Sequence, residues 1–116
     1  MRKNEFGTPL DRNGYAPSII PDHDEHRCWL CARNGAADPL NRHEVFGGAN
    51  RSKSKQYGLW VHLCHWRCHE GPNGVHSRSD LANHLKEVAQ RKAMEAYGWT
   101  VEDFRAIFHT NYIDEE

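Results

Sequence analysis

The chain has 116 residues, a formal net charge of −1 and 38% hydrophobic residues. This length allows one ordinary domain, whose core is thin enough to gain from a covalent or metal staple. The near-neutral charge excludes the strongly basic surface of a general nucleic-acid-binding domain, so any contact with DNA or RNA must be local.

Residues 1–24 combine three prolines with several glycine and asparagine residues and show little apolar periodicity. Such a segment buries too little surface to offset the entropy of ordering, so we predict a disordered N-terminal arm. The first residues lack the hydrophobic stretch of a secretory signal, and no apolar run is long enough to span a membrane. We therefore expect a cytoplasmic protein without a membrane partner, with one folded domain over 25–116.

The folded region is predicted to begin with a zinc knuckle. Its four cysteines fall into two pairs, Cys28 with Cys31 and Cys64 with Cys68. Residues four apart share one face of a helix, so the second pair can join the first around one metal ion. In a reducing compartment, clustered cysteines are more often metal ligands than disulfides. We predict a structural Zn²⁺ site of four cysteines, with His65 or His69 as the alternative fourth ligand.

Two strands are predicted over 42–46 and 59–64, where aromatic and β-branched residues are enriched. The loop between them carries Arg51, Lys53 and Lys55. After the second strand, CHWRCHE has no breaker before Gly71 and can form about two helical turns. Residues 25–78 therefore predict a zinc knuckle followed by a ββα unit.

Two C-terminal helices are predicted within 79–116. The first spans 79–97, where apolar residues follow helical spacing and Gly98 closes the run. The second follows a capping start at Thr100 and carries an apolar stripe to Phe108. The predicted fold class is α+β, a small zinc-stapled ββα-metal core with additional C-terminal helices.

A second metal site is predicted from three histidines. His43, His69 and His76 lie in the first strand, the following helix and the turn after it. Imidazoles suit zinc and other transition metals, and fewer than four protein ligands leave positions for water and a phosphate oxygen. This is the donor set of an open, catalytic type of site.

The segment RHEVFGGANRSKS, followed by LWVHLCHWRCHEGPNGVH, resembles the HNH endonuclease family, in particular small HNH-type proteins of phages and prophages. The resemblance covers roughly residues 28–76. It implies a single divalent metal, Mg²⁺, Mn²⁺, Ni²⁺ or Zn²⁺, held by histidines of the first strand and the helix. It also implies a general base that activates water for attack on a phosphodiester.

One position departs from the family pattern. His43 matches the first residue of the usual His-His pair, whereas Glu44 stands where the family has its catalytic histidine. Glu44 is then either the general base or a metal ligand. Alternatively, His43 is the base and the metal ligands, which include His69, are rearranged. A glutamate pKa of about 4.3 makes a weak base at neutral pH unless burial raises it. Asn50 corresponds approximately to the family asparagine, which positions the loop or the base.

Four cationic residues are expected to contact phosphates, although an ordinary charged loop is an equally good interpretation. They are Arg42, Arg51, Lys53 and Lys55. Trp29, Trp60 and Trp66 are expected to pack around the zinc staple rather than to stack on bases.

The leading hypothesis is a metal-dependent HNH-type endonuclease that hydrolyses phosphodiester bonds of nucleic acid, with DNA as the expected substrate, in the host cytoplasm during a phage life cycle. The main alternative is a non-catalytic zinc-binding module that retains the fold and binds nucleic acid or protein. A third is a phage protein that binds a host protein through its C-terminal helices. The oligomeric state is left open.

Overall fold

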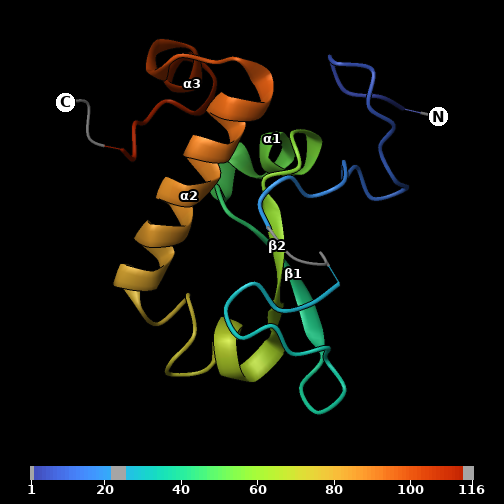
Figure 1. The fold of residues 1–116 in the computed structure, drawn as a ribbon, viewed down its shortest axis with the longest axis vertical. Coiled ribbons are helices and arrows are strands. Elements are labelled where there is room, and N and C mark those ends of the chain that lie inside the picture. The colour runs from blue at the N-terminus through green and yellow to red at the C-terminus, as the bar shows by residue number, and fades with distance from the viewer. Residues whose placement is uncertain (1, 22–25, 114–116) are drawn as a thin grey trace.

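A two-stranded antiparallel sheet lies at the centre of the molecule (Figure 1). The computed structural model describes residues 2–21 and 26–113. The strands are β1 (Leu40–Glu44) and β2 (Trp60–Cys64), and His43 pairs with Val61 across the sheet. The predicted α+β class is confirmed in its coarse form: a small sheet, helices and a four-cysteine cluster.

The connection between the strands is helical, whereas the sequence predicts an open basic loop. It contains a short turn, η1 (Gly48–Asn50), and the helix α1 (Arg51–Gln56). Ser54 anchors this helix: its buried hydroxyl donates to the carbonyl of Phe46 at 2.8 Å and accepts from the amide of Phe46 at 3.0 Å. A polar helix that docks through one serine has no apolar spacing for sequence analysis to detect.

Replacing Ser54 with alanine is expected to lower the free energy of unfolding by about 1–3 kcal/mol, because a buried amide and carbonyl lose their partner. The matched control is Ser52→Ala on the exposed side of the same helix, which should cost less than about 0.5 kcal/mol. Urea unfolding followed by circular dichroism measures both. Equal effects of the two substitutions would contradict an anchoring role for Ser54.

Three helical segments follow β2. They are η2 (His65–Glu70), a single wide turn, α2 (Ser79–Tyr97) and α3 (Val101–Phe108). Gly98, with a φ of +68°, ends α2 in the left-handed conformation that glycine adopts without strain. Thr100 and Asp103 form a capping box at the start of α3. The predicted bounds of both C-terminal helices are confirmed.

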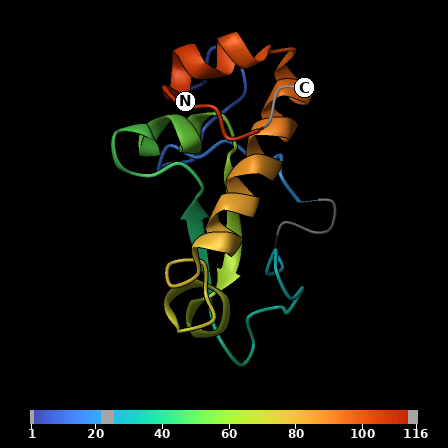
Figure 2. The ribbon, with the colours of Figure 1, turned by 90° about the vertical axis from the view of Figure 1, so that its left-hand side faces the viewer.

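The hydrophobic core lies between the sheet and the two C-terminal helices. Its largest fully buried apolar side chains are Ile20, Phe46, Leu59, Leu63, Leu85, Phe104 and Phe108. Figures 1 and 2 show α2 running alongside the sheet, with α1 and α3 near one end and η2 at the other. Phe46, which forms hydrogen bonds with Ser54 of α1, also packs against α3: its ring centroid lies 5.4 Å from that of Phe104 and 4.9 Å from that of Phe108.

Residues 2–21, for which the sequence predicts a disordered arm, lie against β2 and α1 in the structure. The indole of Trp60 donates to the carbonyl of Ala16 at 2.8 Å, and the amide of Asn4 donates to the carbonyl of Gln56 at 2.8 Å. Ile20 is buried. These contacts join residues 44 and 52 positions apart, which local composition cannot reveal. The predicted boundary at residue 24 lies outside the described residues.

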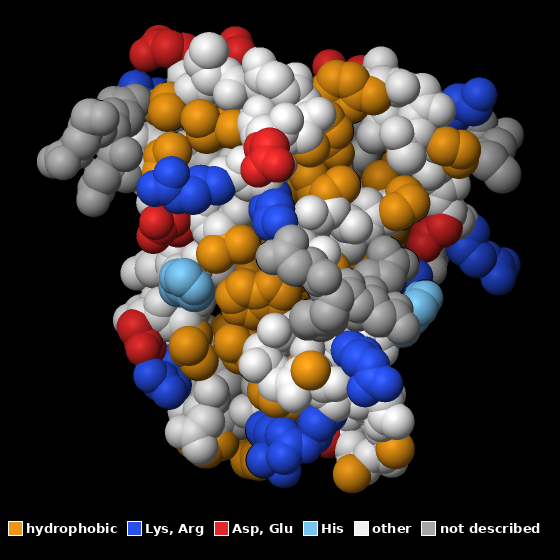
Figure 3. All heavy atoms as spheres, viewed as in Figure 1, with side chains coloured by type: hydrophobic (Ala, Val, Ile, Leu, Met, Phe, Trp, Pro, Cys, Tyr) orange, Lys and Arg blue, Asp and Glu red, His pale blue; other side chains and the backbone are white. Residues whose placement is uncertain are grey.

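The face seen in Figure 3 carries lysine and arginine side chains in scattered groups, with hydrophobic side chains reaching the surface near its middle. This distribution agrees with a net charge of −1 and gives this face no extended basic patch. Within residues 2–21 and 26–113, no helix has the length and apolar character of a membrane span.

Candidate metal centres

The four cysteines predicted to bind zinc come together in the structure. The sulfur atoms of Cys28, Cys31, Cys64 and Cys68 all lie within 4.8 Å of one another, and none forms a disulfide. The Sγ atoms of Cys31 and Cys64 are 3.6 Å apart. Tetrahedral zinc with Zn–S bonds of about 2.3 Å needs about 3.8 Å between sulfurs. This cluster can therefore hold a structural metal such as zinc.

The electrostatics of the cluster also fit a cation. Burial, together with the neighbouring Cys31 and Cys28, raises the pKa of Cys64 to about 12. Burial likewise raises the pKa of Cys68. It acts in the same direction on Cys31, but hydrogen bonds from Arg33 and the other thiols outweigh it and lower that pKa to about 6. Because the pKa values of Cys64 and Cys68 are raised, a divalent cation is needed to convert all four thiols to thiolates at neutral pH.

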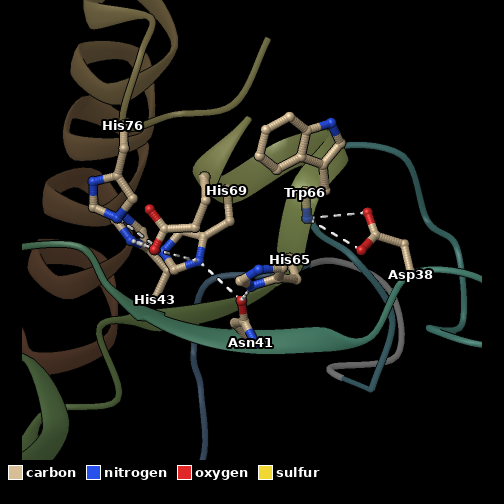
Figure 4. Close-up of polar contacts among 8 residues, drawn as sticks. Asp38, Asn41, His43, His65, Trp66, His69 and His76 are labelled. Carbon is tan, nitrogen blue, oxygen red and sulfur yellow. Dashed lines mark hydrogen bonds and ion pairs between the residues drawn. The ribbon is translucent and has the colours of Figure 1, made fainter. Parts of the chain in front are cut away.

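The three histidines of the predicted second site also converge (Figure 4). Their ligand nitrogens lie within 4.8 Å of one another. His69 is central: its Nε2 is 3.3 Å from Nδ1 of His43 and 2.9 Å from Nε2 of His76. Zn–N bonds of about 2.0–2.1 Å place two ligand nitrogens about 3.3 Å apart. The histidine cluster can therefore also bind a metal.

Burial keeps two of these imidazoles neutral. It lowers the pKa of His43 to about 3, with further lowering by the charges of His69 and His76. Burial also lowers the pKa of His69, again reinforced by His76. Neutral imidazoles retain the lone pair that a metal ion needs, so His43 and His69 can bind metal at neutral pH without first losing a proton.

Both clusters depend on η2. Cys64 and Cys68 are four residues apart, and their sulfur atoms lie beside those of the first cysteine pair. His65 and His69 have the same spacing one position further on, and both contact Asn41 of β1. Adjacent pairs with the same spacing thus face in two directions. The alternative in which His65 or His69 completes the zinc site does not fit this arrangement.

The turn after η2 brings His76 to His69. The amide of Val75 donates to the carbonyl of Cys68 at 2.9 Å, and that of His76 donates to the carbonyl of His69 at 3.2 Å. Gly74 permits this close approach, because a Cβ there would lie 2.5 Å from the carbonyl oxygen of His69. The sequence GPNGVH therefore folds the third histidine back onto the helical turn.

The histidines line an open cleft of about 370 Å³. Arg42, Arg51 and Lys86 add positive charge to its wall, while Glu44 and Glu70 add carboxylates. A cleft with a metal-binding donor set and cationic side chains suits an anionic ligand such as a phosphate group. Lys86, on α2, was not anticipated from the sequence.

Glu44 lies in this cleft, but its carboxylate is already engaged. One oxygen accepts from the hydroxyl of Tyr15 at 3.1 Å, and the other is 3.2 Å from Nε of Arg51. Alternation along β1 turns Glu44 and His43 to opposite faces of the strand. His43 faces the other histidines, whereas Glu44 holds Arg51 beside the cleft.

Three of the other predicted site residues make contacts outside the cleft. The Asn50 amide donates to the carbonyl of Phe108 at 3.0 Å, and the ammonium of Lys53 donates to the carbonyl of Ile107 at 2.6 Å. Both therefore cap the C-terminal end of α3. Lys55 lies over the ring of Tyr15, 5.0 Å from its centroid. The described residues that line the cleft do not include these three, and their predicted roles toward nucleic acid stay predictions.

The tryptophans divide between packing and exposure. Trp29 is partly buried against the core that contains the cysteines, as predicted. Trp60 is buried against Tyr15 and Ala16 of the N-terminal segment instead. Trp66, on η2, is 61% exposed and does not pack around the cysteine cluster. Its amide instead donates to Asp38, as Figure 4 shows.

Comparison with family models, curated proteins and solved structures gives no match for this chain. The resemblance to the HNH family therefore rests on the sequence motif. The structure itself establishes a small α+β fold with a two-stranded sheet, a four-cysteine cluster that can hold a metal such as zinc, and a histidine cluster that can bind a metal.

Proposed function

We propose that the chain is a metal-dependent endonuclease of the HNH type that hydrolyses phosphodiester bonds of nucleic acid, with DNA as its expected substrate. The observation that carries this proposal is the convergence of His43, His69 and His76 in an open cleft. Three protein ligands leave coordination positions free for water and a phosphate oxygen.

Each residue around the cleft has a role in this proposal. The three histidines bind the divalent ion, which would polarise the phosphate and stabilise the leaving oxygen. Arg51 and Lys86 neutralise charge on the remaining phosphate oxygens. Glu44 holds Arg51 in place through its 3.2 Å contact. Each of its oxygens keeps a further lone pair beside the contacts to Tyr15 and Arg51, so its carboxylate can accept the proton of the attacking water. The four cysteines hold structural zinc.

A non-catalytic module that binds nucleic acid or protein is the second candidate. The contacts of Glu44 favour it, because the position at which the family has its catalytic histidine carries a carboxylate bound by Tyr15 and Arg51. A host-protein partner that binds the C-terminal helices remains a further expectation.

Nicking of supercoiled plasmid by the zinc-loaded protein separates these candidates. We expect nicking only when Mg²⁺, Mn²⁺, Ni²⁺ or additional Zn²⁺ is supplied, and we expect its loss in His43→Ala and His76→Ala variants that keep the cysteine-bound zinc. His84→Ala, exposed on α2, is the matched control and should nick like the wild type. Equal nicking by the wild type and the cluster variants would identify a contaminant. DNA binding without nicking would favour the module.

A further inference from the structure

A residue that the family resemblance does not assign lies beneath the histidine cluster. Asn41 precedes His43 by two positions on β1, so the two side chains share one face of the strand. Oδ1 of Asn41 lies 2.7 Å from Nδ1 of His65 and 3.2 Å from Nδ1 of His69, as the dashed lines of Figure 4 show. An amide oxygen only accepts hydrogen bonds, so both histidine nitrogens donate to it.

This contact determines which nitrogen of His69 carries the hydrogen. A neutral imidazole has one N–H and one lone pair. With the hydrogen on Nδ1, the lone pair lies on Nε2, the atom 3.3 Å from Nδ1 of His43 and 2.9 Å from Nε2 of His76. The other group near Nδ1 is the Glu70 carboxylate, which at 3.9 Å is too distant for a hydrogen bond.

We propose that Asn41 is a positioning residue of the histidine site, which holds His69 in the Nδ1–H form and aims its Nε2 at the metal. The inference rests on the proposed function only in that it assigns a divalent metal to this cluster. Outer hydrogen bonds of this kind fix the tautomer and the ring orientation of metal-binding histidines.

His65 has a defined part in the same arrangement. Its Nδ1 donates to the same oxygen, so two donors together hold the Asn41 amide with its oxygen toward the rings. With the amide reversed, its NH₂ group would face both imidazoles and His69 would carry its hydrogen on Nε2. That hydrogen would point at His76 and His43 and would block the metal. His65 therefore supports the site without being a ligand.

The test compares Asn41→Leu, which removes the acceptor, with Asn41→Asp, which keeps it. Asn83→Leu, at an exposed asparagine of α2 that does not line the cleft, is the matched control. Titration of zinc-loaded protein with Mn²⁺ or Ni²⁺ measures the affinity of the histidine site. We expect Asn41→Leu to weaken binding by about 10–100-fold, and Asn41→Asp and Asn83→Leu to bind at least as tightly as the wild type. Unchanged affinity in Asn41→Leu would overturn the proposal.

Nitrogen-15 NMR of the histidine rings, without metal at the histidine site, gives a second readout that is independent of nuclease activity. We expect Nδ1–H for His69 in the wild type and in Asn41→Asp, and a loss of this preference in Asn41→Leu. Nε2–H in the wild type would overturn the proposal whatever the titrations show. If the NMR pattern holds but plasmid nicking is absent, the role of Asn41 stands and the nuclease proposal fails.

Discussion

Replacing Cys64 with serine is expected to abolish zinc retention and to leave the chain largely unfolded at room temperature. A structural zinc ion contributes an apparent free energy of about 10–16 kcal/mol in small zinc-folded peptides. The whole stability of a domain is only about 5–15 kcal/mol. Cys64 is fully buried at the end of β2, beside the other three cysteines. Loss of the metal therefore removes the link that joins the segment of Cys28 and Cys31 to β2 and η2.

Zinc content by elemental analysis and folding by circular dichroism check this expectation. Ala36→Ser, exposed in the segment that follows the knuckle, is the matched control and should keep both zinc and fold. Chelation of the wild type should reproduce the unfolded spectrum, and added Zn²⁺ should restore the native one. A Cys64→Ser variant that melts at the wild-type temperature would contradict a structural role for the cluster.

The substitution His69→Ala is expected to have the largest effect on activity, a loss of plasmid nicking of more than about 100-fold. Removal of an outer partner of a metal ligand already costs about 10–100-fold in metal affinity or activity. His69 is itself the central donor, in contact with both His43 and His76, and its removal leaves two imidazoles that no longer share a common neighbour.

The variant should retain the cysteine-bound zinc, because His69 contributes no atom to that cluster. Nicking rates and Mn²⁺ titration, each with His84→Ala as the control, measure the two losses together. Retention of both second-metal binding and nicking in folded His69→Ala would refute the assignment of this cluster as the site of chemistry.

Features with a local signal could be predicted from the sequence. The short spacing within each cysteine pair identifies the four cysteines as metal ligands. Gly98 marks the end of α2 and Thr100 the start of α3, because each residue type favours the backbone conformation found there. The helix α1 could not be predicted in this way, because the serine that docks it looks like any other serine in a polar segment. The packing of residues 2–21 depends on contacts across 44 and 52 positions, for which the sequence offers no comparable signal.

The candidate site follows the same division. His43, His69 and His76 could be predicted as a set because each lies on a predicted element. Asn41 was not found, because the predicted strand begins at residue 42, whereas β1 begins at Leu40 and places Asn41 two residues before His43 on the same sheet face. The hydrogen bond from Tyr15 to Glu44 could not be predicted, because the segment that contains Tyr15 was expected to be disordered.

The neighbours Cys68 and His69 belong to two different candidate metal sites on one turn of η2. Insertion or deletion of a single residue between Cys64 and His69 would therefore rotate donors of both sites at once. We therefore expect this turn to tolerate substitution better than a change of length, for example at the exposed positions Trp66 and Arg67. In proteins related to this chain, we expect the number of residues in this turn to be conserved even where the residue types differ.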